Sequence, residues 1–114
     1  MTNEMPEWIK KVMENLKDSE VKPIFSDEVV VAGIVKGMRT QRGIEKEGHI
    51  NLIFVDRTNL QPIGRYVLSL STASGLINAL KAQVERVNQQ LKKKEIPEKV
   101  TPSSTEEAKL SYIG

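Results

Sequence analysis

Side chains suited to acid–base, nucleophilic or metal chemistry are scarce in this chain. His49 is the only histidine, and there is no cysteine. A metal centre uses several His, Cys or carboxylate ligands, and a thiol nucleophile needs a cysteine. Glu47 would share a strand face with His49, because side chains alternate along a strand, and Asp56 follows further along. One imidazole beside one carboxylate is a common surface pair. We therefore expect no catalytic residue, no metal ligand and no cofactor, in a protein that is not an enzyme.

Four hydroxyl side chains, Ser69, Ser71, Thr72 and Ser74, gather where a long helix is predicted to begin. Hydroxyls beside the free N–H groups of a helix N-terminus can bind an anion such as phosphate. The same side chains can simply cap the helix, with Ser71 accepting a hydrogen bond from the N–H of Ser74. A Gly-rich phosphate-binding loop ending in Lys-Ser or Lys-Thr is absent from the sequence. Capping is the favoured interpretation.

Positive charge is concentrated in two segments, although the net charge of the chain is only +2. Residues 36–48 carry four cations and two anions, and residues 81–94 carry five cations and one anion. A flexible basic loop and a basic helix could follow the phosphates of a nucleic acid, although the scattered aromatic residues offer no platform for stacking bases. Sequence-nonspecific nucleic-acid binding is thus the alternative function. Its expected contacts are Arg39, Arg42, Lys46, Arg86, Lys92, Lys93 and Lys94.

An apolar heptad repeat runs along the predicted long helix, over residues 72–94. It interleaves two sets of residues spaced by seven: Ala73, Leu80 and Val87, and Ile77, Val84 and Leu91. The inner part of this seam can pack on the sheet of the same chain. The outer part would overhang it, because a helix of about twenty residues spans about 30 Å, whereas short strands span about 17–23 Å. We expect a homo-oligomer, most simply a two-fold dimer. Its expected interface comprises Ile77, Leu80, Val84, Val87 and Leu91.

The elements that would position these side chains follow from the hydrophobic pattern. Apolar residues recur at helical spacing over residues 6–17, and Pro6 suits the first helical position. Runs of β-branched and apolar residues predict three strands. These strands cover residues 28–36, 49–56 and 63–70, and the basic segment between the first two, Gly37 to Gly48, is expected to be a mobile loop. Strands joined without intervening helices predict an antiparallel meander.

The predicted fold is therefore α+β: an N-terminal helix, a three-stranded antiparallel meander, and a long C-terminal helix packed on the sheet and partly available for oligomerisation. Residues 1–94 would form one domain, and the polar residues 95–114 a flexible tail. Residues 1–17 carry charges throughout, unlike a signal peptide, and every apolar run is too short to span a bilayer. We expect a cytoplasmic protein that does not interact with a membrane.

Three sequence features occur in a fixed order between residues 30 and 89. An aliphatic strand with a Phe and a closing Asp precedes a strand with an Arg near its start, which runs into a Ser-capped helix. These features are residues 52–56, residues 65–71, and then Ala73, Leu76 and Ala79-Leu80. In them the chain resembles a small uncharacterised prokaryotic family known only as a domain of unknown function. The resemblance implies a meander followed by a helix, and it implies no activity, because none is established for that family.

Overall fold

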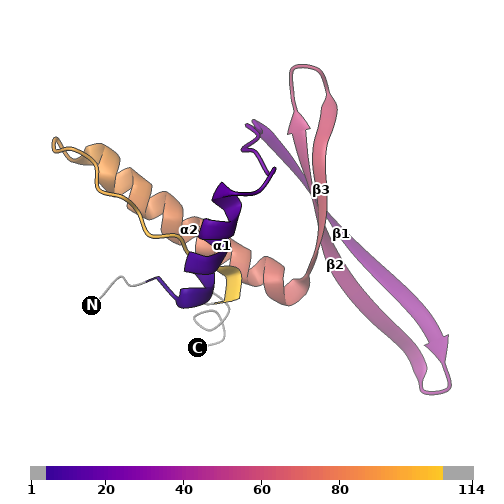
Figure 1. Cartoon of the computed structure of the whole chain (residues 1–114). Coiled ribbons are helices and arrows are strands. Elements are labelled where there is room, and N and C mark those ends of the chain that lie inside the picture. Colours follow the sequence, from indigo (N-terminus) through magenta and orange to yellow (C-terminus); the bar gives the residue numbers. More distant parts are fainter. Residues whose placement is uncertain (1–4, 107–114) are drawn as a thin grey trace. The chain divides into compact units, whose positions relative to one another are not determined.

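The computed structural model describes residues 5–106 and divides them into two compact units (Figure 1). A sheet unit comprises residues 24–73, and a helical unit comprises the residues up to 23 and from 74 onward. The elements are α1 (Glu7–Lys17), β1 (Glu28–Thr40), β2 (Gly43–Asp56), β3 (Gln61–Ser69) and α2 (Leu70–Lys92). The predicted α+β class and the predicted order of elements are confirmed. How α2 packs against the sheet stays a prediction, as does a single domain over residues 1–94.

The strands described in the sheet unit form the predicted antiparallel meander, with β2 between β1 and β3. Asn51 of β2 lies opposite Ala32 of β1 and Val67 of β3, so these three residues share one face of the sheet. We call it the Asn51 face. The other face, which carries Leu52 and Tyr66, is the Leu52 face. The ladder between β2 and β3 contains an irregularity at Phe54/Val55.

The prediction of a mobile loop at residues 37–48 is wrong. β1 and β2 stay paired from Glu28↔Val55 up to Thr40↔Gly43. The pairing of β3 with β2 extends only to His49↔Ser69, so residues 35–48 form a two-stranded ribbon beyond β3 (Figure 1). We call this ribbon the arm. Its backbone groups pair with each other, which is why a segment rich in Gly and charge can be a regular strand pair here.

Two residues, Thr40 and Gly43, stabilise the turn at the tip of the arm. Gly43 has φ +118°, a conformation that favours glycine. The Thr40 hydroxyl accepts a hydrogen bond from the N–H of Arg42 and donates one to the carbonyl of Gly43, each at 3.2 Å. The local chemistry of Thr40 and Gly43 therefore closes a tight hairpin.

The connection between β2 and β3 is organised by Asp56, as the polar residues there suggested. Its Oδ1 accepts the N–H of Thr58 at 3.1 Å, and its Oδ2 accepts the side-chain amide of Asn59 at 2.8 Å. Asp27, just before β1, accepts the N–H of Arg57 at 3.1 Å. These bonds hold the turn against the start of β1.

The two helices begin differently from the predictions. Pro6 is the residue before α1 rather than its first helical residue, and its carbonyl accepts the N–H of Ile9 and of Lys10 at 3.1 Å. In α2 the predicted cap, Ser71, is wrong, because the helix already begins at Leu70. The hydroxyl of Ser69 accepts the N–H of Thr72 at 3.1 Å and donates to the Thr72 hydroxyl at 3.0 Å. Ser69 therefore satisfies an N–H that the first helical turn leaves free.

The described part of the tail contacts α2. Gln83 donates from its side-chain amide to the Thr101 carbonyl at 2.9 Å and to the Ser103 hydroxyl at 2.7 Å. Further along, the Gln90 side-chain oxygen accepts the N–H of Glu98 at 3.2 Å. Residues 98–103 thus lie against the helix, and the flexibility of the tail stays a prediction. Residues 107–114 of that predicted tail lie outside the described residues.

Apolar side chains are poorly covered in each unit taken by itself. Among residues 5–106, the buried hydrophobic side chains are Ile9 and Ala79. Large apolar side chains on both units are exposed, for example Val31 of β1 at 61% and Leu91 of α2 at 75%. Burial of such side chains is the main favourable term in folding and association. These surfaces therefore need a cover beyond the unit that carries them.

Candidate interaction surfaces

The five predicted interface residues of the heptad repeat lie along one side of α2 with exposed side chains, and we call them the seam: Ile77, Leu80, Val84, Val87 and Leu91. Exposure ranges from 46% at Val87 to 75% at Leu91. Gln83, Arg86 and Gln90 hydrogen-bond the tail, and each of them precedes a seam residue by one position. One residue corresponds to about 100° around a helix, so the tail and the seam occupy different sides of α2. The contacts of the tail leave the seam uncovered.

The side of α2 that contacts the tail also carries small residues. Gly75 and Ala79 are buried, and they continue the stripe of Gln83, Arg86 and Gln90 at spacings of three and four. Small side chains let another segment of backbone approach closely. The helix therefore has one side built for contacts within the chain and another side, the seam, that is apolar and exposed.

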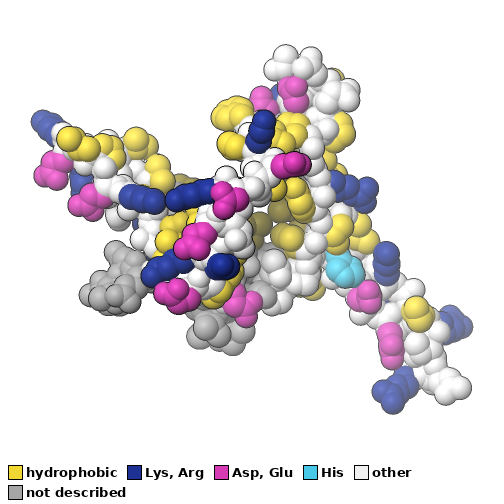
Figure 2. All heavy atoms as spheres, in the orientation of Figure 1, with side chains coloured by type: hydrophobic (Ala, Val, Ile, Leu, Met, Phe, Trp, Pro, Cys, Tyr) yellow, Lys and Arg dark blue, Asp and Glu magenta, His cyan; other side chains and the backbone are white. Residues whose placement is uncertain are grey.

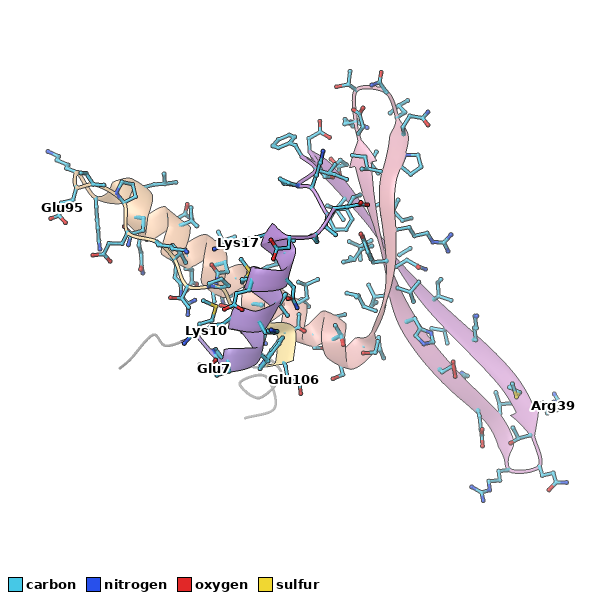
Figure 3. All side chains as sticks on the ribbon, viewed as in Figure 1. Glu7, Lys10, Lys17, Arg39, Glu95 and Glu106 are labelled. Atoms are coloured by element: carbon cyan, nitrogen blue, oxygen red, sulfur yellow. The ribbon has the colours of Figure 1, made fainter. Side chains whose placement is uncertain are left out.

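The arm separates its charges between its two faces. Arg39 and Lys46 lie on the Leu52 face, since Arg39 pairs with Ile44 and Lys46 with Gly37. Arg42 lies in the turn at the tip of the arm, and Arg39 lies close to that tip (Figure 3). Figure 2 shows Lys and Arg side chains gathered around this end of the arm. The acidic residues of the arm, Glu45 and Glu47, lie on the Asn51 face instead. The Leu52 face of the arm is therefore cationic. The segment as a whole carries charges of both signs, so its sequence does not indicate this separation.

The remaining predicted nucleic-acid contacts belong to the helical unit. The guanidinium of Arg86 donates to the Thr101 carbonyl at 3.3 Å and to the Ser103 hydroxyl at 3.1 Å. Lys92 is the last residue of α2, and exposed Lys93 and Lys94 follow it. The structure thus brings Arg39, Arg42 and Lys46 together on the arm and places the other four cations on a different unit. Arg86 is engaged in holding the tail.

Of the residues considered for catalysis, His49 and Glu47 lie on the Asn51 face, and Asp56 ends β2 and organises the β2–β3 connection. His49 pairs with Ile34 and Ser69, and Glu47 pairs with Lys36. Within residues 5–106, no group of three or more His, Cys, Asp or Glu side chains is placed to hold a metal ion. Ser69 is used as the cap of α2. Ser69 therefore has a structural role, and the expectation of a protein that is not an enzyme stays a prediction.

Asn51 is a polar residue that the sequence pattern did not single out. Its side chain is 3% exposed, and its Oδ1 has no hydrogen-bond partner among the described residues. An unpaired buried polar group costs about 1–3 kcal/mol. The available signal was an amide residue in the middle of an otherwise apolar run, Ile50 to Phe54, where Asn is disfavoured in a strand.

Comparisons with protein-family models, with curated proteins and with solved structures found no match for this chain. The resemblance to an uncharacterised prokaryotic family therefore stays a prediction. No helix in the described part of the chain is long and apolar enough to cross a membrane. Any functional proposal therefore rests on the surfaces themselves.

Proposed function

We propose that this protein is a non-catalytic interaction module that self-associates through the seam of α2. The observation that carries the proposal is the exposure of all five seam residues on a side of α2 that the tail does not occupy. Aligned apolar residues at alternating spacings of three and four are the pattern by which helices pair. A second copy offers the same pattern, so a two-fold contact would bury both seams at once.

The double variant Val84→Glu/Leu91→Glu tests this proposal. It removes two apolar side chains per copy and places charges in the contact, so we expect association to weaken at least about a hundredfold. Light scattering at micromolar concentration measures the mass, and circular dichroism checks that the strands are retained. The control Asn88→Glu/Gln89→Glu changes the charge of the same helix equally but spares the seam. If Val84→Glu/Leu91→Glu associates as tightly as the wild type when the protein is diluted, or if the control weakens association equally, the proposal is contradicted.

A second candidate function, sequence-nonspecific nucleic-acid binding, is favoured by the charge separation on the arm. We infer that Arg39, Arg42 and Lys46 would contact phosphates. A two-stranded ribbon fits the major groove of DNA, and the Leu52 face of the arm carries cations without anions. On this hypothesis Arg86 and Lys92 to Lys94 add a second, separate set of cations.

Fluorescence anisotropy with a mixed-sequence duplex tests the second candidate. We expect binding at about 50 mM salt that weakens steeply as salt rises, because bound counterions are released. Arg39→Gln/Lys46→Gln should reduce the slope of log affinity against log salt by about two. The control Lys11→Gln/Lys17→Gln removes two exposed cations from α1 and should leave that slope nearly unchanged. A duplex that does not bind at low salt excludes this candidate.

A further inference from the structure

The two edges of the sheet differ in how well they are protected. β3 contains Pro62, which has no N–H to offer, and its ladder is irregular at Phe54/Val55. β1 is longer, contains no proline, and is almost entirely apolar from Val29 to Val35. In the described residues no strand pairs with the outer edge of β1. A long apolar edge strand presents unpaired backbone groups and is a template for another strand.

We propose that β1 pairs antiparallel with β1 of a second copy, about a two-fold axis at Ala32. In this register the numbers of two residues that lie opposite each other add up to 64. On the Asn51 face, Glu28 then lies opposite Lys36 of the partner at both ends of the contact, and Val30 lies opposite Ile34. On the Leu52 face, Val29 lies opposite Val35, and Val31 lies opposite Gly33. Opposite charges and apolar side chains that face each other across strands are stabilising.

The charges select this register over its neighbours. A two-fold axis preserves the faces of the sheet, so the axis can shift only by whole residues along β1. An axis at Gly33 would place Glu28 opposite Met38 and Lys36 opposite Val30. An axis at Val31 would place Glu28 opposite Ile34. Each alternative leaves charges facing apolar side chains, whereas the axis at Ala32 pairs both.

The occupant is a second copy because the strand is complementary to itself. An unrelated extended peptide would need an acidic and a basic residue eight positions apart, with an apolar run between them, which is the sequence of β1. The resulting sheet would be continuous across the axis and would end on the protected β3 edges. This contact uses the sheet unit, whereas the proposed seam contact uses α2, so each can fail without the other.

Single cysteines test the register directly, because the full chain contains no other thiol. Directly opposed residues in an antiparallel pair have Cα atoms about 4.5–5.5 Å apart, within the range that a disulfide spans. We expect Ala32→Cys to form a cross-linked dimer on mild oxidation. In Val35→Cys the two thiols would lie about 20 Å apart. That exposed position measures the background of random collisions. Cross-linking of Ala32→Cys no greater than this background overturns the proposal.

Charge reversal provides a second, independent readout. Glu28→Lys alone would place Lys opposite Lys36, and Lys36→Glu alone would place Glu opposite Glu28. Each variant should associate at least about fivefold more weakly than the wild type. A mixture of the two variants restores opposite charges at both ends of a heterodimer, and we expect its association to return to near the wild-type level. Variants that are not rescued by mixing contradict the register.

The seam variant separates this inference from the proposed function. Ala32→Cys should still cross-link in the Val84→Glu/Leu91→Glu background, because the β1 contact does not use α2. Loss of cross-linking in that background overturns an independent β1 contact. Cross-linking that persists while the seam variant associates as tightly as the wild type in a dilution series supports the β1 contact and contradicts the seam.

Discussion

Leu60 adopts a backbone conformation that leucine disfavours. Its φ is 54°, in the left-handed region, and its side chain is 70% exposed at the end of the β2–β3 connection. Leu60→Gly removes a steric cost of about 1–2 kcal/mol and adds a smaller entropic cost in the unfolded chain. We expect the free energy of unfolding to rise by about 0.5–1 kcal/mol in urea titrations. Arg57→Gly in the same loop should lower it, and a loss of stability in Leu60→Gly contradicts the argument.

Asp56 shows how one carboxylate organises a turn. The hydrogen bond from the Asn59 side chain, followed by those from the N–H of Asn59 and of Thr58, lowers the pKa of Asp56 below the ordinary 3.8. Because the folded-state pKa is depressed, Asp56 stabilises the fold above the ordinary pKa and loses this contribution as the pH falls through the folded value. We expect Asn59→Ala to raise the pKa of Asp56 toward 3.8 in an NMR titration. An unmoved pKa in that variant would contradict the assigned cause.

The arm is the element whose structure differs most from its sequence pattern, and its tip can be tested. Gly43 has φ +118°, whereas Gly33 lies within β1 and has open space where a methyl group would be added. Gly43→Ala should destabilise the arm by about 1 kcal/mol, which lowers the hydrogen-exchange protection of its amides about fivefold. Gly33→Ala should leave this protection unchanged or raise it. Equal effects of the two substitutions would show that the tip does not limit the stability of the arm.

Two sides of the long helix carry different kinds of residue and make different contacts. Gly75 and Ala79 are buried, and Gln83 and Gln90 hydrogen-bond the tail. The seam lies about 100° away and is exposed. Residues 95–106 are polar in composition. The amide side chains of Gln83 and Gln90 nevertheless form hydrogen bonds with backbone groups of this segment. This arrangement explains why the tail can lie on the helix without covering the seam.

At the scale of the whole molecule, the two proposed contacts predict a stepwise loss of mass. Val84→Glu/Leu91→Glu should leave β1 pairing, Glu28→Lys should weaken β1 pairing and leave the seam, and the combined variant should have the mass nearest to the 12.8 kDa monomer. Light scattering of the four proteins measures this series. Raising the salt should not weaken the seam, because apolar contacts are not screened, but it should weaken the Glu28–Lys36 pairs of the β1 contact. A monomeric wild-type protein contradicts both contacts.

Two two-fold contacts on one chain also constrain the assembly. If both axes coincide, the seam and β1 hold the same dimer together; if they intersect at right angles, they close a tetramer. Axes that neither coincide nor intersect would give open chains. The wild-type mass relative to the two single-contact variants therefore distinguishes these arrangements.

The amino-acid sequence by itself determined the elements and their order. Periodicity predicted α1 to within one residue of its start, the three strands as an antiparallel meander, and the long helix with its heptad repeat. These features are local: each depends on spacing along the chain, on turn residues such as Asp56, and on alternation between two faces. For the same reason the spacing of apolar residues was sufficient to name the members of the seam.

Only the tertiary structure decided which partners satisfy the backbone and which face each charge occupies. The arm, predicted as a loop, is a ribbon because residues 36–40 find their hydrogen-bond partners in residues 43–47. The register of that pairing places Arg39 and Lys46 on one face and Glu45 and Glu47 on the other. Ser69, rather than Ser71, caps α2. The helix begins at Leu70, directly after β3 ends at Ser69, so Ser69 is the residue before the first helical turn. The register of the arm decides these charge placements, and a pattern of residue types does not contain the register, because a shift of one residue moves every side chain to the other face.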